Sequence, residues 1–312
     1  MKVWAAVPLM LAVFWTPSAA AASCTQTAAS RNVPTALILS GGGAKGAYEA
    51  GSAAAFAERG LPFRIVAGSS AGALNAAMIV AGRADRLEAL WRAVKKDQVY
   101  SLRAPVLFAG LLPGWLTLLA LDGAGSLLDS QPLRGLITAS VDFERIRNSP
   151  IRLLVTATDL ARREQRAFDN RTVTVDVLMA AAAVPGAFPA VDVDGALLVD
   201  GGLTGRAPVL EALAASSVER AVVVLSYAPD EQSARPTTIR RSLESALETV
   251  MLHNVRRDVE LARLKYPAVD VQLLSPSAPL SLRPLEFDPD GMARILALGR
   301  SDALECLKSW GE

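Results

Sequence analysis

The sequence FRIVAGSSAGALNAAMI, Phe63–Ile79, begins with a short β-rich run, continues through a Gly-Ser-Ser-Ala-Gly pentapeptide and ends in an alanine-rich helical run. A serine at such a strand-to-helix turn is exposed at the C-terminal edge of a sheet, where the N–H groups that begin the next helix favour developing negative charge. Ser70 is therefore the candidate nucleophile. The same pattern also occurs by chance as a small-residue turn between a strand and a helix, so its context must decide.

A similar strand, loop and helix lie just upstream. The apolar run Ala36–Leu39 is typical of a strand buried on both faces, and it leads into the glycine loop, residues 40–46, and the helical pattern Ala47–Arg59. Consecutive glycines after a strand can present backbone N–H groups to a substrate oxygen, and Lys45 adds positive potential beside them. The candidate oxyanion-hole residues are Gly41, Gly42 and Gly43.

The same loop fits a dinucleotide-binding pattern, G-x-G-x-x-G, through Gly41, Gly43 and Gly46. That fold needs an acidic residue at the end of the next strand to bind the ribose, whereas this strand ends in Ala-Gly-Ser-Ser, residues 67–70. The phosphate-binding pattern G-x-x-x-x-G-K-[ST] fails as well, because Ala47 follows Gly46. Nucleotide binding is therefore the weaker interpretation.

A serine nucleophile needs a base to take its proton. The chain has one histidine, His253, and the order Ser70, Asp200, His253 is that of an α/β-hydrolase triad. His253 lies within the long helical pattern Ile239–Tyr266, whereas a triad histidine normally follows a strand. A histidine-dependent α/β-hydrolase is therefore an alternative and not the main hypothesis.

A carboxylate can act as the base instead of histidine. Asp200 is the best placed by sequence, since it ends a predicted strand and is followed by Gly201-Gly202. Asp159, which follows another buried strand, is the second candidate. Two further aspartates, expected in a hairpin turn, are Asp192 and Asp194.

Strands and helices alternate along most of the chain, which indicates an α/β domain with a mostly parallel sheet. No internal repeat or sharp boundary divides the chain, so we expect a single domain over residues 35–312. The other predicted elements are strands at Phe63–Ala67, Ile151–Thr158, Glu164–Phe168, Ala190–Val193, Ala196–Val199, Glu219–Ser226 and Val269–Leu274, and helices at Ala71–Ala81, Ala84–Lys96, Val173–Ala183 and Met292–Trp310.

Composition agrees with a large globular protein. The chain has 312 residues, of which 51% are hydrophobic and 20% charged, so it can bury a sizeable core. Its net charge of +1 provides no general attraction for nucleic acid.

The first 22 residues have the pattern of a secretory signal peptide. Lys2 precedes the apolar run Trp4–Trp15, and the small-residue region Pro17–Ala22 follows it. Because the apolar run is short for a membrane span, we expect export to the periplasm or the medium, with an uncleaved N-terminal anchor as the alternative. Residues 23–34 are expected to form a linker.

The two cysteines have three alternative states. In an oxidising compartment Cys24 and Cys306 could form a disulfide that joins the ends of the mature chain. Cys24 could instead carry a lipid as in bacterial lipoproteins, although Ala21 stands where their motif usually has leucine. The third state is a pair of free thiols.

Ala104–Leu121 is the most apolar stretch outside the signal peptide. Pro113-Gly114 interrupts it, and its length is limited, which argues against a membrane-spanning helix. Two interpretations stay open: a buried helical hairpin, or an exposed flap that contacts lipid.

Taken in order, these motifs resemble those of the patatin-like phospholipase family. Gly41–Tyr48 resembles the family's oxyanion motif, Gly68–Gly72 its nucleophile motif and Asp200–Gly202 its catalytic aspartate motif. Ala183–Pro189 resembles the proline-bearing block that precedes the aspartate. The similarity spans Ala36–Pro208, more than half of the chain.

The resemblance implies a three-layer α/β/α core that carries a Ser70–Asp200 dyad and hydrolyses lipid esters without metal or cofactor. Two positions depart from the family pattern: Arg206 stands where asparagine is frequent, and Ala181 or Ala182 where serine is common. The main hypothesis is an exported serine acyl hydrolase acting on phospholipids or related lipids. Besides the histidine-dependent hydrolase, the other alternative is a non-catalytic lipid-binding protein on the same fold.

Overall fold

The structure, a computed structural model, describes residues 24–25, 27–104, 106, 116–117, 123, 125–228 and 235–311. The predicted signal peptide, residues 1–22, and most of the apolar segment 104–121 lie outside these residues.

An eight-stranded sheet forms the centre of the molecule. Its strands, in spatial order, are β11 (Asp270–Leu274), β10 (Arg220–Val224), β2 (Thr35–Leu39), β3 (Phe63–Gly68), β6 (Arg152–Asp159), β9 (Ala196–Asp200) and β8 (Val191–Val193), with β7 (Glu164–Phe168) also paired to β6.

The sheet is parallel from β11 to β6 and antiparallel where β7, β8 and β9 join it. The central strands β2 and β10 are apolar at nearly every position and wholly buried, as expected of parallel strands that are covered on both faces. The predicted α/β class with a mostly parallel sheet is confirmed.

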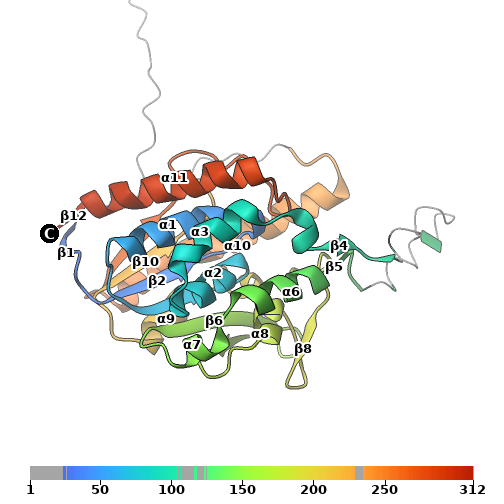
Figure 1. Ribbon diagram of the computed structural model, residues 1–312, viewed down its shortest axis with the longest axis horizontal. Helices are drawn as coiled ribbons and strands as arrows, with labels where there is room; N and C mark the ends of the chain where they lie inside the picture. The colour runs from blue at the N-terminus through green and yellow to red at the C-terminus, as the bar shows by residue number, and fades with distance from the viewer. Residues whose placement is uncertain are drawn as a thin grey trace, which may run out of the picture.

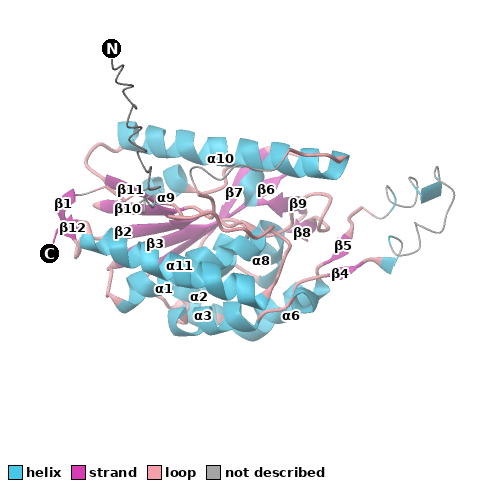
Figure 2. Ribbon diagram, turned by 90° about the horizontal axis from the view of Figure 1, so that it is seen from above, coloured by secondary structure: helices cyan, strands magenta, loops and turns pink. Residues whose placement is uncertain are grey.

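Helices cover both faces of the sheet, which makes the three-layer α/β/α arrangement (Figures 1 and 2). One face carries α1 (Gly46–Glu58), α2 (Ala71–Val80), α3 (Ala84–Ala93) and α11 (Pro289–Lys308), the other carries α9 (Val209–Ala215) and α10 (Ile239–Lys265), and α6 (Gln131–Ser140), α7 (Phe143–Arg147) and α8 (Val175–Ala181) lie near the β6–β8 end.

Strand β2 shows how one strand contributes to two hydrophobic cores. Leu37 and Leu39 face the core formed with α1 and α2, whereas Ala36 and Ile38 face the core formed with α9 and α10. Successive side chains of a strand point to opposite faces, so a continuous apolar run supplies both layers. The sheet therefore holds the loops at its strand ends on a rigid base.

Part of the segment predicted as a linker is regular structure. Thr27–Ser30 forms strand β1, which pairs in parallel with β12 (Trp310–Gly311) as a separate two-stranded sheet. The linker prediction is therefore wrong for these residues. A short polar strand has no apolar alternation, and its partner lies at the other end of the chain, so the local sequence gave no signal for it.

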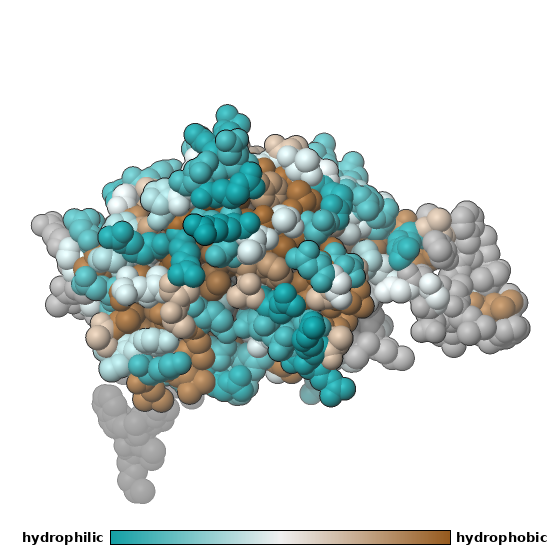
Figure 3. All heavy atoms as spheres, turned by 90° about the horizontal axis from the view of Figure 1, so that it is seen from below, coloured by the Kyte–Doolittle hydropathy of each residue, from teal (hydrophilic) through white to brown (hydrophobic). Residues whose placement is uncertain are grey.

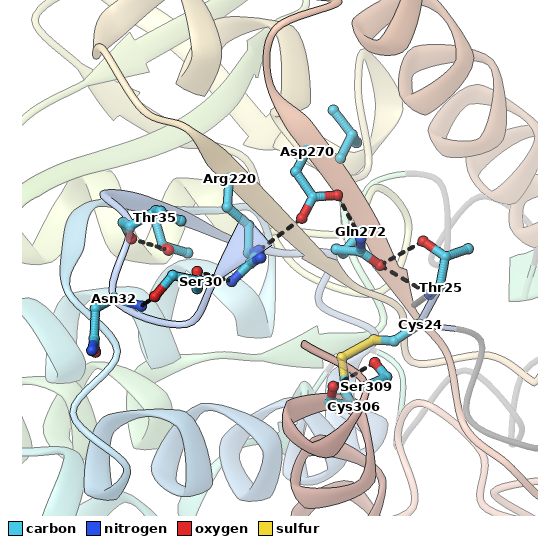
Figure 4. Close-up of polar contacts among 12 residues, drawn as sticks. Cys24, Thr25, Ser30, Asn32, Thr35, Arg220, Asp270, Gln272, Cys306 and Ser309 are labelled. Carbon is cyan, nitrogen blue, oxygen red and sulfur yellow. Dashed lines mark hydrogen bonds and ion pairs between the residues drawn. A yellow bond between two sulfur atoms is a disulfide. The ribbon is translucent and has the colours of Figure 1, made fainter. Parts of the chain in front are cut away.

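The two cysteines form a disulfide, which is one of the three states considered from the sequence. The Cα atoms of Cys24 and Cys306 are 5.3 Å apart. Next to Cys24, the N–H and the hydroxyl of Thr25 both donate to Oε1 of Gln272 at 3.0 Å (Figure 4). The first described residues are thus fixed against both α11 and β11.

Two short strands flank the apolar segment. β4 (Ser101–Leu102) and β5 (Leu128–Asp129) pair antiparallel, so the chain before the segment lies beside the chain after it. The segment itself is almost entirely outside the described residues, and the choice between hairpin and flap stays open.

Among the described residues, no helix has both the length and the apolar character needed to cross a membrane. The same part of the chain contains no group of three or more histidine, cysteine, aspartate or glutamate side chains that could hold a metal ion. Hydrophobic and hydrophilic residues are interspersed on the face drawn in Figure 3. Within the described ranges, the exposed large hydrophobic residues are Leu102, Leu127, Leu160, Leu197, Val250, Leu261 and Leu264.

Candidate active site

Ser70 occupies the turn between β3 and α2. Its φ of 53° and ψ of −136° lie in a region that side-chain-bearing residues rarely adopt. The Ser70 hydroxyl makes no capping bond to α2, so local structure does not engage it. The strained turn leaves this hydroxyl at the N-terminus of the helix, where a nucleophile is expected.

The glycines around Ser70 are required by space. A Cβ atom on Gly72 would lie 2.5 Å from the carbonyl oxygen of Leu39, and one on Gly68 would lie 2.4 Å from the carbonyl oxygen of Gly72. Real Cβ contacts are not this short, so only glycine lets α2 begin this close to the sheet. The small-residue turn and the nucleophile are therefore two aspects of the same motif.

Asp200 lies at the end of β9 and is buried. Its Oδ1 accepts a hydrogen bond from the N–H of Gly202 at 2.7 Å. Its Oδ2 has no hydrogen-bond partner among the described residues. One carboxylate oxygen therefore fixes the side chain, and the other is available to a proton.

The end of α8 holds the serine and the aspartate by their backbones. The Ser70 N–H donates to the carbonyl oxygen of Ala181, and the Asp200 N–H donates to that of Ala183, both at 2.9 Å. The sequence analysis noted this segment because Ala181 or Ala182 stands where serine is common in the family. Its contacts to the site are made by carbonyl groups, which any residue carries, so alanine in place of serine leaves them intact.

Burial raises the pKa of Asp200 to about 6. The Gly202 N–H, the Ser70 hydroxyl and the positive charge of Arg206 oppose that rise. The side chains of Asp200 and Ser70 are thus near enough for the hydroxyl to affect this pKa, although no hydrogen bond joins them within the described residues. Such bonds are often long in an unliganded site and shorten when substrate binds. A carboxylate with this pKa is ionised at neutral pH and can still accept a proton.

The three glycines of the loop have different roles. All have positive φ, which favours glycine. The Gly41 N–H donates to Oε1 of Glu49 at 2.7 Å, so this amide is not free for an oxyanion, contrary to the prediction. The N–H groups of Gly42 and Gly43 donate no hydrogen bond within the described part of the chain. They are the amides that an oxyanion could use.

Gly41 instead provides space for the nucleophile. A Cβ atom at this position would lie 2.7 Å from the Cβ of Ser70 and 2.5 Å from the carbonyl oxygen of Ser69. The loop and the serine turn are therefore in direct contact.

Two buried cations lie beside the loop. The Nζ of Lys45 is 4.2 Å from the ring centroid of Tyr227, and the guanidinium carbon of Arg206 is 4.3 Å from the same centroid. Both contacts are within the range of cation–π attraction. Lys45 was expected here from the sequence, whereas Arg206 was noted only as a departure from the family pattern.

Glu49 is the site residue that the sequence did not single out. It lies in the first turn of α1 and is fully buried. Burial raises its pKa to about 7, against three hydrogen bonds and the charge of Arg206, which lower it. The available signal was an acidic residue within an otherwise alanine-rich, apolar helix start.

Asp159, the second candidate base, is fully engaged elsewhere. Its Oδ1 accepts from the N–H groups of Ala161 and Arg162, and its Oδ2 pairs with Arg162 at 3.0 Å. The backbone and side chain of Arg162 hold the pKa of Asp159 below its ordinary value. These interactions make it a poor proton acceptor.

The other candidates lie outside the site. His253 is exposed on α10 and makes no hydrogen bond to Ser70 or Asp200 within the described residues. Asp194 lies in the turn between β8 and β9, as predicted, with a φ of 52°. Asp192 lies in β8 itself, and its side chain accepts from the N–H of Gly195 in that turn.

Comparison with known proteins agrees with the motif order. Residues 37–213 match the family model described as patatin-like phospholipase. Uncharacterized NTE family proteins of Mycobacterium tuberculosis and Mycobacterium bovis are 28% identical over 173 residues, 55% of this chain. The match covers 44% of each relative, so the chain matches less than half of their length.

Two solved structures align with most of this chain. VipD of Legionella pneumophila aligns with a TM-score of 0.48 and 14% identity over 93% of this chain and 70% of its own. The type III effector ExoU of Pseudomonas aeruginosa aligns with a TM-score of 0.44 and 18% identity over 90% of this chain and 54% of its own.

Proposed function

The chain belongs to the patatin-like phospholipase family, and from this premise we propose that it is an exported serine acyl hydrolase that cleaves ester bonds of phospholipids or related lipids. The observation that carries the proposal is Oδ2 of Asp200, a buried carboxylate oxygen that has no hydrogen-bond partner among the described residues, while the Ser70 hydroxyl lowers the pKa of the same carboxyl group. No group in the described part of the chain donates to this oxygen, which a proton acceptor needs to have free.

In the proposed reaction, Ser70 Oγ attacks the ester carbonyl carbon and its proton passes to Asp200 Oδ2. The tetrahedral intermediate collapses, the C–O bond to the alcohol breaks, and Asp200 returns the proton to the leaving oxygen. Water then attacks the acyl-serine ester and gives a proton to Asp200. That proton returns to Ser70 as the fatty acid leaves, so the enzyme ends in its starting state.

The negative charge that develops on the carbonyl oxygen is stabilised by the N–H groups of Gly42 and Gly43. The N-terminus of α2, directly after Ser70, adds favourable potential. Loss of one oxyanion donor typically lowers the rate by about 100- to 1000-fold. In the proposed mechanism the chain's own backbone supplies the groups that stabilise the oxyanion.

Two further parts of the proposal rest on other regions. Export is supported by the signal-peptide pattern and by the Cys24–Cys306 disulfide, because disulfides persist in oxidising compartments. Membrane contact through the apolar segment Ala104–Leu121 is supported by its composition.

The test is hydrolysis of a panel of phospholipids and lysophospholipids in vesicles, with products identified by mass spectrometry. We expect Ser70→Ala and Asp200→Asn each to lower the rate by about 100- to 10,000-fold, because each removes a group that takes part in proton transfer or bond formation. Circular dichroism checks that both variants are folded. A folded Ser70→Ala variant that keeps full activity would falsify the mechanism.

Fluorophosphonate labelling separates the enzyme from a non-catalytic lipid-binding protein on the same fold. We expect wild type to be labelled at Ser70 and Ser70→Ala to remain unlabelled. An unlabelled wild-type protein that still binds vesicles would favour the non-catalytic alternative.

A further inference from the structure

Buried polar side chains hold Gly41 at both of its backbone groups. Its N–H donates to Glu49 Oε1 at 2.7 Å. Its carbonyl oxygen accepts from Ser226 Oγ at 2.6 Å and from Arg206 Nη2 at 3.4 Å. These three side chains come from α1, the loop after β10 and the loop after Asp200, and we call them the glycine-loop clamp.

The clamp fixes the direction in which the next amide points. In a trans peptide the C=O and the N–H of one unit point in opposite directions. Because the Gly41 carbonyl points to Arg206 and Ser226, the Gly42 N–H points away from them. In the same way, the Gly42 carbonyl accepts from the N–H of Lys45 at 3.2 Å, which turns the Gly43 N–H away from that contact. The two free amides thus owe their direction to bonds made by the carbonyls before them.

Glu49 is a costly residue to keep where it lies. Its Oε1 is also 2.9 Å from Ser40 Oγ and 3.1 Å from Ser226 Oγ, and its Oε2 has no partner within the described residues. A buried carboxylate with an unpartnered oxygen destabilises the fold unless its hydrogen bonds compensate. All the hydrogen bonds of its side chain go to the start of the glycine loop or to Ser226, which itself binds Gly41. The hydrogen bonds that compensate for burying Glu49 are therefore the same bonds that hold the glycine loop in place.

Arg206 connects the loop to the other two motifs. Its own carbonyl oxygen accepts from the hydroxyl of Ser69, beside the nucleophile, while its guanidinium reaches Gly41 and stacks on Tyr227. The contact to Gly41 is made by the far end of the side chain. Asparagine, the residue frequent at this position in the family, is too short to make it from the same backbone position. The connection is therefore a property of this chain's own residue.

We propose that Glu49 and Arg206 are positioning residues that, through Gly41, orient the Gly42 amide toward the reacting carbonyl oxygen. The inference rests on the proposed acyl hydrolase function. Both residues bind Gly41 on the side away from the Gly42 N–H, so we assign them a positioning role and not a direct contact with the ester. Their removal should lower kcat and leave KM nearly unchanged, because a displaced oxyanion donor weakens binding of the transition state more than that of the ester.

The test compares Glu49→Ala, Glu49→Gln, Arg206→Asn and Arg206→Lys, using a soluble nitrophenyl ester and thermal unfolding. We expect Glu49→Ala and Arg206→Asn to lower kcat per folded molecule by about 10- to 100-fold, with KM changed by less than about twofold. Glu49→Gln should recover most of the kcat, since its amide oxygen can still accept from Gly41. Arg206→Lys should recover part of it.

Asp302→Asn is the matched control. Asp302 is also a buried carboxylate, and it accepts from Tyr48 Oη at 3.0 Å and Ser277 Oγ at 2.6 Å, away from the glycine loop. We expect this variant to unfold at a lower temperature and to keep kcat within about twofold.

Two results would overturn the inference: wild-type kcat in folded Arg206→Asn and Glu49 variants, or an equal loss of kcat in Asp302→Asn. If Glu49→Ala does not fold, Arg206→Asn decides alone. Ser70→Ala in the same assay distinguishes a failure of the proposed function from a failure of the positioning role. If it retains activity the proposed function fails, whereas if it alone is inactive only the positioning role fails.

Discussion

One arginine is buried against an aromatic ring at the end of the sheet where the parallel strands begin, and another at the end where they finish. The two arginines differ in their hydrogen-bond and ion-pair partners. Arg220, at the start of β10, lies 4.1 Å from the Trp310 ring, binds Asp270 Oδ2 at 2.9 Å and donates to the carbonyl oxygen of Ser30 (Figure 4). Arg206, at the opposite edge, stacks on Tyr227, makes one long bond to Gly41 and has no partner for its Nε within the described residues. Within the part of the chain that the structure describes, Arg220 has a carboxylate partner and Arg206 has none within salt-bridge distance.

The difference extends beyond the arginines. Among the described residues, six buried side-chain atoms lack a hydrogen-bond partner, and three of them belong to Glu49, Asp200 and Arg206. Only Trp310 Nε1 lies at the Arg220 end. Unpartnered buried groups cost stability, and natural proteins retain them where function needs a free group. This difference supports the proposed mechanism, in which the chemistry takes place at the Arg206 end and the Arg220 end contributes stability.

Outside Ser70 and Asp200, we expect the largest effect from removal of the disulfide, which should lower the free energy of unfolding. Cys24 and Cys306 are 282 positions apart, and a bridge of this kind typically contributes about 2–5 kcal/mol. We expect Cys24→Ser with Cys306→Ser to lower the free energy of unfolding by about this amount, measured by urea denaturation. The kcat per folded molecule should be unchanged, because the bridge lies at the end opposite Ser70.

The control is wild type treated with a reductant. It should become as unstable as the double variant, and the double variant should not respond to the reductant. If the double variant lost more kcat than its loss of folded protein explains, the disulfide end of the sheet would also contribute to activity, contrary to the prediction.

The next prediction concerns pH. Burial raises the pKa of Asp200 to about 6, so kcat/KM should fall as the pH drops below about 6 and the base is protonated. Stability should change in the opposite direction. Between pH 4 and 6 folded Asp200 holds a proton that the unfolded chain has lost, so its contribution to stability falls as the pH rises. Asp200→Asn should therefore be more stable than wild type at pH 7, by on the order of 1–3 kcal/mol.

Thermal unfolding of both proteins at pH 4 and pH 7 checks this sign. The difference in melting temperature should be present at pH 7 and small at pH 4. An Asp200→Asn variant less stable than wild type at pH 7 would show that the free carboxylate oxygen stabilises the fold.

The smallest expected effect is that of His253→Ala. This exposed side chain belongs to neither end of the sheet, so we expect kcat/KM within about twofold of wild type and stability within about 0.5 kcal/mol. A large loss of kcat/KM with normal folding would restore the histidine-dependent alternative.

The sequence predicted those features that depend on neighbours along the chain. The apolar runs of β2, β3 and β10 indicated buried parallel strands, and the glycines around Ser70 indicated a tight turn, because both patterns are local. Helix α11 begins at Pro289, three residues before its predicted start, since Asp288 caps it by accepting from the N–H of Gly291. That boundary depends on a cap outside the apolar pattern.

Local sequence patterns could not predict contacts between segments that are far apart along the chain. The partner of β1 is at the far end of the chain, and Ser226 and Arg206 meet Gly41 from positions 185 and 165 residues away. The sequence also indicated Gly41 as an amide donor, because a glycine run shows where N–H groups can be exposed. It does not show which of them a buried carboxylate will occupy.

The sequence by itself determined the fold class, the strand-to-helix turn at Ser70 and the glycine loop, since each follows from the order of neighbouring residues. Only the tertiary structure decided which amides are free, because Glu49, Arg206 and Ser226 converge on Gly41 from three separate elements. Hydrogen bonds depend on direction and distance, and those are set where elements pack together.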